Sequence, residues 1–265
     1  MTRPSANDLS FDAALAALAW QVELGVDEAI SDSPIDRFVA EAGPSLKGLK
    51  FTKESNIQPL QANKPVVQAA PEVAALMAGQ AKTLDDLRNA MGIFDQCSLK
   101  EGARNLVFAD GTPGAKVMII GEAPGRDEDR EGRPFVGRAG QLLDKMFAAI
   151  DLGRERSGQQ ALYITNVVPW RPPQNRDPNA EEIAMMRPFL ARHVELAAPE
   201  VLVVMGNTAL NAVLGKTGIT RVRGTWAEAF GLPVMPMFHP AALLRDPLKK
   251  RPAWEDLQNI QDRLA

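Results

Sequence analysis

The sequence predicts an α/β protein: a three-layer sandwich with a central, mainly parallel four-stranded sheet, plus an N-terminal helix and a flexible tether. Beyond about residue 71, short apolar or β-branched runs alternate with helical stretches, which is the pattern of strands joined by crossover helices. Long polar loops follow these runs. Because ligands of such sheets bind outside the carboxyl ends of the strands, these loops are where we expect a site.

The first 70 residues are predicted to form a separate part. Residues 11–24 (FDAALAALAWQVEL) have apolar residues at helical spacing and predict a short amphipathic helix. The segment that follows, up to residue 70, is interrupted by proline, glycine and serine and predicts a mostly disordered linker. The helix is compatible with docking a repair or replication protein, and equally with a poorly constrained terminus.

Residues 71–265 are predicted to be the folded domain. Four runs are typical of buried parallel strands: Lys116–Ile120, Leu162–Asn166, Val201–Met205 and Val234–Phe238. Four stretches between and after them predict helices: 139–150, 180–196, 208–215 and 252–265. The residues Asp177, Pro178 and Asn179 give a start signal for the second helix, and Asn207 is a candidate cap for the third.

Composition excludes several classes of protein. The net charge of −3 argues against a general polyanion binder, so contacts to nucleic acid would come from local arginines. No apolar run approaches the length of a membrane span and the start lacks a signal peptide, so we expect a cytoplasmic monomer without membrane contact. The single cysteine, Cys97, cannot by itself hold a zinc ion or an iron–sulfur cluster.

The loop Gly121–Gly140 is long and glycine-rich, and it lacks the Gly-Lys-Ser/Thr ending of a phosphate-binding Walker loop. A long loop without regular structure is usually functional. Glu122 directly follows a buried strand and is a candidate for chemistry, whereas the other acids also fit a solvated loop. Phe135, the one aromatic residue here, either plugs the loop onto the core or offers a flat face for a base to stack on.

Two further candidates end strands. His239 follows the fourth strand, where an imidazole can donate to a developing anion, while the other histidine, His193, lies mid-helix and is expected to pack. Asn166 ends the second strand as either a turn residue or an amide that reads a base edge. Two adjacent leucines, Leu243 and Leu244, follow His239 on a predicted tight turn.

Three ordered motifs, GEAPGRDEDREGRPFVGRAG, YITNVVPWRPPQNR and FHPAALLR, resemble the family 4 branch of the uracil-DNA glycosylase superfamily over residues 91–265. The resemblance implies a base-flipping repair hydrolase that cuts the N-glycosidic bond of uracil in DNA and leaves an abasic site. It implies that Phe135 stacks on uracil, that Asn166 binds its Watson–Crick edge and that His239 stabilises the uracil anion. The other implied substrate-contacting residues are Gly121, Ala123, Pro124 and Gly125.

The resemblance also implies a DNA-contacting set: Arg138, Arg171, Asn207, Leu243, Leu244 and Arg245, with the two leucines wedging the duplex. Superfamily members that use an aspartate as the base carry it two residues after the first motif glycine, where this chain has Ala123. The available carboxylates are Glu122 and, in support of it, Glu128.

The chain departs from the family at the metal. Family 4 enzymes usually hold a four-iron four-sulfur cluster on four cysteines, and the matching positions here are Phe94, Cys97, Trp170 and Met186. We therefore expect no cluster and no other cofactor. The three replacements are large and apolar, so we expect them to pack with Cys97 as a small core.

Two alternatives remain open from the sequence. Ala123 keeps open a protein that binds uracil in DNA without turnover, although DREGRPF lacks the basic insertion of relatives that capture uracil covalently. The N-terminal helix and tether are compatible with a polymerase-associated or nucleotide-handling module of the same fold.

Overall fold

The computed structural model describes residues 70–265. The helix predicted at 11–24 and the linker up to residue 69 lie outside the described residues. The first described element is helix α2 (Ala70–Gln80), so the domain start at residue 71 stays a prediction. None of the helices in the described part is long and apolar enough to cross a membrane.

The described residues form a six-stranded sheet in the order β1-β3-β2-β4-β6-β5. Its strands are β1 (Asp110–Gly111), β2 (Val117–Gly121), β3 (Leu162–Asn166), β4 (Val201–Met205), β5 (Ala227–Ala229) and β6 (Leu232–Met237). The four predicted strands are confirmed as β2, β3, β4 and β6, which pair in parallel. The short edge strands β1 and β5 pair antiparallel to β3 and β6 and were not predicted.

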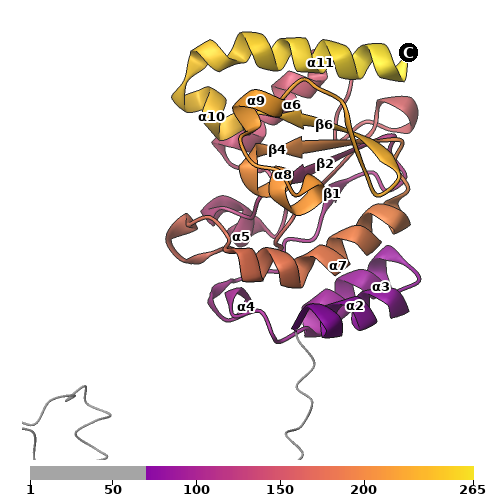
Figure 1. The fold of residues 1–265 in the computed structure, drawn as a ribbon, viewed down its shortest axis with the longest axis vertical. Helices are drawn as coiled ribbons and strands as arrows, with labels where there is room; N and C mark the ends of the chain where they lie inside the picture. The colour runs from indigo at the N-terminus through magenta and orange to yellow at the C-terminus, as the bar shows by residue number, and fades with distance from the viewer. Residues whose placement is uncertain (1–69) are drawn as a thin grey trace, which may run out of the picture. The chain divides into compact units, whose positions relative to one another are not determined.

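Helices cover both faces of this sheet (Figure 1). Besides α2, they are α3 (Leu84–Ile93), α4 (Leu99–Gly102), α5 (Arg126–Glu131), α6 (Arg138–Ala148), α7 (Ala180–Ala197), α8 (Gly206–Leu214), α9 (Ile219–Val222), α10 (Pro240–Arg245) and α11 (Lys250–Leu264). The four predicted helices are confirmed as α6, α7, α8 and α11. The α/β three-layer class is confirmed as well.

The strands separate two hydrophobic cores because alternate side chains point to opposite faces. In β2, Met118 and Ile120 pack with α2, α3, α7 and α8, while Val117 and Ile119 pack with α6 and α11. Figure 1 shows α6 and α11 on one side of the sheet and α2, α3 and α7 on the other. Every residue of β2, β3 and β4 is buried, which explains their continuous apolar pattern.

Two local predictions are wrong. The loop after β2 is not free of regular structure, because α5 forms within it. This helix ends at Glu131 and is followed by Gly132, whose φ of 72° places it in the left-handed region. Asn207 does not cap α8, which begins one residue earlier at Gly206. Its side-chain oxygen instead accepts the backbone N–H groups of Gly218 and Ile219 at 3.2 and 2.9 Å, at the start of α9.

The start of α7 is confirmed at the predicted signal. Asn179 is the N-cap: its side chain accepts the N–H of Glu182, and the Glu182 carboxylate accepts the N–H of Asn179, both at 2.8 Å. Glu182 is buried and also binds both terminal nitrogens of Arg176, at 2.6 and 2.9 Å. These contacts fix the end of the loop that joins β3 to α7.

The four positions that match the family's cluster ligands all lie in one hydrophobic core. Phe94, Cys97, Trp170 and Met186 are at most 3% exposed. Phe94 packs edge-to-face on Phe189 of α7, with ring centroids 5.3 Å apart. As expected, these side chains share a core, but it is the main core of the α7 side rather than a separate small one.

We predict that Trp170→Ala destabilises the fold by about 3–5 kcal/mol, because it leaves a cavity that the surrounding core can fill only in part. Urea unfolding measures the change. Trp254→Ala on α11 is the matched control: this tryptophan is 42% exposed, and we expect a loss of about 0.5 kcal/mol. Equal losses at the two positions would contradict a core role for Trp170.

Candidate active site

The register of the parallel strands brings the ends of four strands to one edge of the sheet. Gly121 of β2 lies opposite Asn166 of β3, and Met205 of β4 lies opposite Met237 of β6. The chain stays paired just beyond β2 and β3, where the N–H of Val168 donates to the carbonyl of Glu122 at 3.1 Å. The four segments that follow these strands therefore meet at one place.

A pocket of about 450 Å³ opens where these segments meet. This volume lies within the range of small-molecule sites. The loop after β2 contributes the predicted residues Glu122, Ala123, Pro124, Gly125, Glu128 and Phe135. The other three segments contribute Asn166, Asn207, His239 and Arg245.

Five predicted residues do not line this pocket. Arg138 is exposed at the start of α6, and Arg171 donates to the side-chain oxygen of Asn175 at 2.7 Å. The prediction that two leucines face DNA is wrong for Leu243, which is 1% exposed because α10 turns it into the core. Leu244 is 40% exposed.

The fifth, Gly121, lies under the pocket and makes room for two of its walls. A side chain at this position would come within 2.6 Å of the Phe135 ring and would also collide with the side-chain oxygen of Asn166. Phe135 is 5% exposed and stacks loosely on His239, with ring centroids 5.4 Å apart and planes at 28°. Phe135 therefore both packs on the core and forms a wall of the pocket.

His239 presents a neutral imidazole to the pocket. It is the N-cap of α10, and its Nδ1 accepts the N–H of Ala241 at 3.2 Å, so the ring proton is on Nε2. Burial, with a further contribution from the positive charge of Arg245, lowers the pKa of His239 to about 4. At neutral pH the ring is thus an uncharged hydrogen-bond donor.

Glu122 has a carboxyl group that is protonated more readily than usual. Burial and, after it, the negative charge of Asp177 raise its pKa, a hydrogen bond from Thr208 opposes them, and the net result is a pKa of about 7. Both neighbours line the pocket, and the sequence analysis missed both. Asp177 looked only like a helix start signal, and nothing in the sequence indicates that it faces Glu122.

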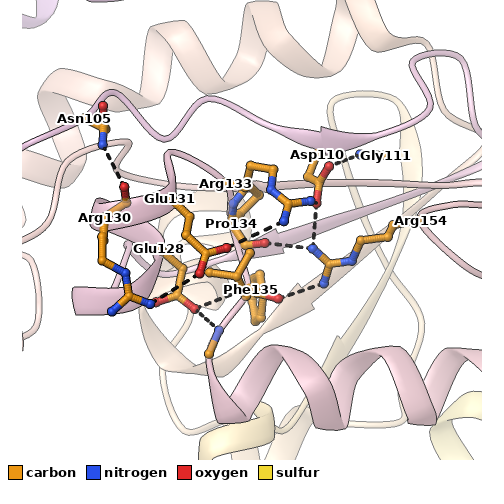
Figure 2. A network of polar contacts seen from close by, with 12 residues as sticks. Asn105, Asp110, Gly111, Glu128, Arg130, Glu131, Arg133, Pro134, Phe135 and Arg154 are labelled. Atoms are coloured by element: carbon orange, nitrogen blue, oxygen red, sulfur yellow. Dashed lines mark hydrogen bonds and ion pairs between the residues drawn. The ribbon is translucent and has the colours of Figure 1, made fainter.

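Glu128 lines the pocket with its carboxylate already bound to the backbone. Its oxygens accept the N–H groups of Gly125, Val136 and Gly137 at 3.1, 3.0 and 2.8 Å. Figure 2 shows the carboxylate against the backbone beyond Phe135. These contacts hold both ends of the stretch from Gly125 to Gly137 together.

Comparisons with known proteins show the family of this chain. The sequence model of the uracil DNA glycosylase superfamily matches residues 108–258. This chain belongs to the uracil-DNA glycosylase superfamily. It is 38% identical to the type-4 uracil-DNA glycosylases of Sulfurisphaera tokodaii and Archaeoglobus fulgidus, over 68% of this chain and 84% and 92% of those proteins. It is 41% identical to that of Thermotoga maritima, over 57% of this chain and 77% of the relative.

The residues of this glycosylase-family chain do not fit an iron–sulfur cluster. Such a cluster needs several thiolates, and the four matching positions supply one thiol, one thioether and two aromatic rings. Burial raises the pKa of the Cys97 thiol, and the charge of Glu182 adds to this, which opposes the thiolate that a metal requires. Within residues 70–265, no three His, Cys, Asp or Glu side chains are grouped to hold a metal ion.

We predict that Glu122 makes the stability of this superfamily member fall as the pH rises. The pKa of Glu122 in the folded state, about 7, exceeds its ordinary value of 4.5, so the folded protein holds the proton more tightly. The resulting stabilisation is complete below about pH 4.5 and is lost as the pH rises through about 7. Glu122→Gln cannot titrate, so its stability relative to the wild type should increase between about pH 5 and pH 8.

Urea unfolding at several pH values measures this difference, in which the contributions of other titrating groups cancel. Asp177→Asn removes one of the two causes of the raised pKa of Glu122. In the Asp177→Asn background, the effect of Glu122→Gln on the free energy of unfolding should depend less on pH. If the stability difference between Glu122→Gln and the wild type does not change with pH, the raised pKa of Glu122 is contradicted.

Proposed function

We propose that this protein hydrolyses the N-glycosidic bond of uracil in DNA and leaves an abasic site. The observation that carries the proposal is the meeting of Glu122, Phe135, Asn166 and His239, from three separate segments, at one pocket. A glycosylase must take its base out of the duplex and enclose it, and this pocket is concave and of suitable size. The membership of the superfamily agrees with this activity.

In this proposal Phe135 and Asn166 recognise the extruded base. The ring of Phe135 supplies a rigid apolar wall, and stacking on an aromatic ring is worth about 1–3 kcal/mol per base. Asn166 is 6% exposed, and it lines the pocket. An amide that has both a donor and an acceptor can pair with the N–H and carbonyl groups of a uracil edge.

Cleavage of the bond leaves its electron pair on uracil and a cationic sugar. The Nε2–H of His239 donates to the uracil anion as that charge develops, and a neutral donor does so without first having to be charged. Water then adds to the anomeric carbon of the sugar and releases a proton, which in the overall reaction neutralises the departing uracil anion. The carboxylate of Glu122 stabilises the cationic sugar and orients this water, and it is the form present above a pH of about 7.

Two carboxylates have different tasks in this proposal. Glu122 faces the reaction, with Asp177 and Thr208 beside it. Glu128 supports it indirectly, because its three backbone contacts hold the loop that carries Glu122 and Phe135. Ala123 has no carboxylate to contribute, so Glu122 is the acid of the loop that carries the chemistry.

Leu244 and the nearby arginines are proposed to contact the DNA around the extruded base. Arg245 lines the pocket next to the exposed Leu244, and Arg138 and Arg171 are each adjacent in sequence to a pocket residue, Ala139 and Pro172. Asn207 is exposed and, among residues 70–265, its side-chain oxygen accepts two backbone N–H groups while its amide nitrogen is proposed to contact a phosphate. A monomeric state and a cytoplasmic location stay predictions from the sequence.

The proposed enzyme works without an iron–sulfur cluster, since its residues supply a single thiol at the family's cluster positions. Purified protein should lack the visible absorbance of such clusters and should contain no stoichiometric iron.

We predict that the wild-type protein produces alkali-labile sites in uracil-containing oligonucleotides, and that His239→Ala lowers the excision rate by about 10²–10³-fold. The substitution also removes the N-cap of α10, which costs about 1 kcal/mol of stability and is checked by thermal unfolding. A gel shift without strand scission by the wild type would support the alternative of binding without turnover. A folded His239→Ala variant with unchanged excision would remove the anion-stabilising role.

We predict that Leu244→Ala slows excision from double-stranded DNA more than from single-stranded DNA. A leucine that fills the gap left by the base offsets the cost of unstacking, and single strands have little stacking to lose. The comparison is the ratio of the two rates. Leu248→Ala is the matched control, because Leu248 is 87% exposed but lies beyond the end of α10. If Leu248→Ala alone changes the ratio, the wedge has been assigned to the wrong leucine.

A further inference from the structure

Arg154 lies outside the pocket and belongs to none of the motifs, yet its guanidinium group donates four hydrogen bonds within the protein. The side chain is 9% exposed. Its Nη1 donates to the carbonyl of Pro134 at 2.9 Å and to Asp110 at 2.8 Å, its Nη2 to the carbonyl of Phe135 at 2.9 Å, and its Nε to Asp144 at 2.9 Å. Figure 2 shows this group between Asp110 and the two carbonyls.

The backbone that Arg154 binds has an unusual conformation. Phe135 has a φ of 54°, in the left-handed region that bulky side chains avoid. Gly140 makes this conformation possible, because any side chain there would clash with the carbonyl of Phe135. Such a conformation persists only where its surroundings hold it, and it is common at functional sites.

Two opposite charges hold the chain on either side of the Phe135 ring. Arg154 binds the carbonyls of Pro134 and Phe135, and Glu128 binds the N–H groups of Val136 and Gly137. The four consecutive residues therefore each give one backbone polar group to a charged side chain. The ring between them is directed onto His239 at the floor of the pocket.

Arg154 is itself fixed by three parts of the fold. Its neighbour Gly153 forms an isolated parallel bridge with Ala161, directly before β3. Asp110 belongs to the edge strand β1, and Asp144 belongs to α6. The guanidinium group thus connects the edge of the sheet and a helix to the carbonyls beside Phe135, and its planar fork suits two adjacent acceptors.

We propose that Arg154 is a positioning residue of the base pocket: it sets the angle of the Phe135 ring against the extruded base and His239. The proposal rests on the proposed function for its catalytic consequence only. Its geometric consequence, that Arg154 acts through Phe135, holds whatever the ligand is.

The test is a cycle of Arg154→Met, Phe135→Ala and the double variant. The first readout is the NMR signal of the His239 ring, which shifts when the Phe135 ring no longer stacks on it. Arg154→Met should move this signal in the same direction as Phe135→Ala, and it should add nothing further in the double variant. His193 is the internal control: it stacks on Phe108 at 4.3 Å, far from Arg154 in the sequence, and its signal should stay.

The second readout is the single-turnover excision rate. We expect Arg154→Met to lower it about 10-fold in the wild-type background and less than about 2-fold in the Phe135→Ala background, as for residues that act as one unit. Arg156→Met is the matched control. Arg156 lies two residues away, is 39% exposed and bonds to Asp151, so its loss should leave the rate and the His239 signal unchanged.

Each result decides one proposal. Independent effects of Arg154→Met and Phe135→Ala, or an unmoved His239 signal, would overturn the positioning role even if uracil is excised. A wild type that excises nothing would overturn the proposed function, while the NMR cycle would still decide on Arg154. If Arg154→Met does not fold, Arg154→Lys takes its place, because lysine keeps the charge but cannot bind both carbonyls. This variant should shift the His239 signal in the same direction as Phe135→Ala.

Discussion

The alignment of four parallel strand ends is the constraint on which the site depends. Gly121 of β2 lies opposite Asn166 of β3, and Met205 of β4 opposite Met237 of β6, so the residues after each strand emerge at one edge. A shift of one residue in either pairing would turn the strand's side chains to the opposite face. The cores on both faces of the sheet forbid this shift, since every residue of β2, β3 and β4 is buried. The packing of the sheet thus determines the geometry of the pocket.

Burial in this pocket moves the pKa values of Glu122 and His239 in opposite directions and reduces the charge of both groups. It raises the pKa of Glu122 to about 7 and lowers that of His239 to about 4. Near neutral pH His239 is therefore uncharged and Glu122 is partly protonated, which suits a neutral base. Charge appears only as the glycosidic bond breaks, with an anion on the base and a cation on the sugar. Groups that interact more strongly with those charges than with the neutral substrate accelerate the reaction.

The sequence predicts those features that depend on residues close together in the chain. Buried strands and capped helices are of this kind, as the predicted start of α7 at Asn179 illustrates. The edge strand β1 has two residues, too few for any periodic pattern, and α5 consists only of charged residues, which resemble a solvated loop. The contacts of Asp177 with Glu122 and of Arg154 with Phe135 join segments that are distant in the sequence, so no local sequence pattern predicts them. Leu243 and Leu244 are adjacent, and only the orientation of α10 decides which one is buried.

At the positions that match the family's cluster ligands, this chain has apolar side chains that pack together in place of cysteines that bind a metal cluster. A metal cluster joins its ligands by bonds, whereas Phe94, Trp170 and Met186 join α3, the loop after β3 and α7 by removing apolar surface from water. This region is also close to the pocket: Cys97 is near enough to Glu182 and Arg176 for their charges to affect its pKa, and Arg176 lines the pocket next to Asp177. The core therefore supports the loop that supplies Asp177 to Glu122. Hydrophobic packing of this kind needs neither iron nor reduced thiolates to position that loop.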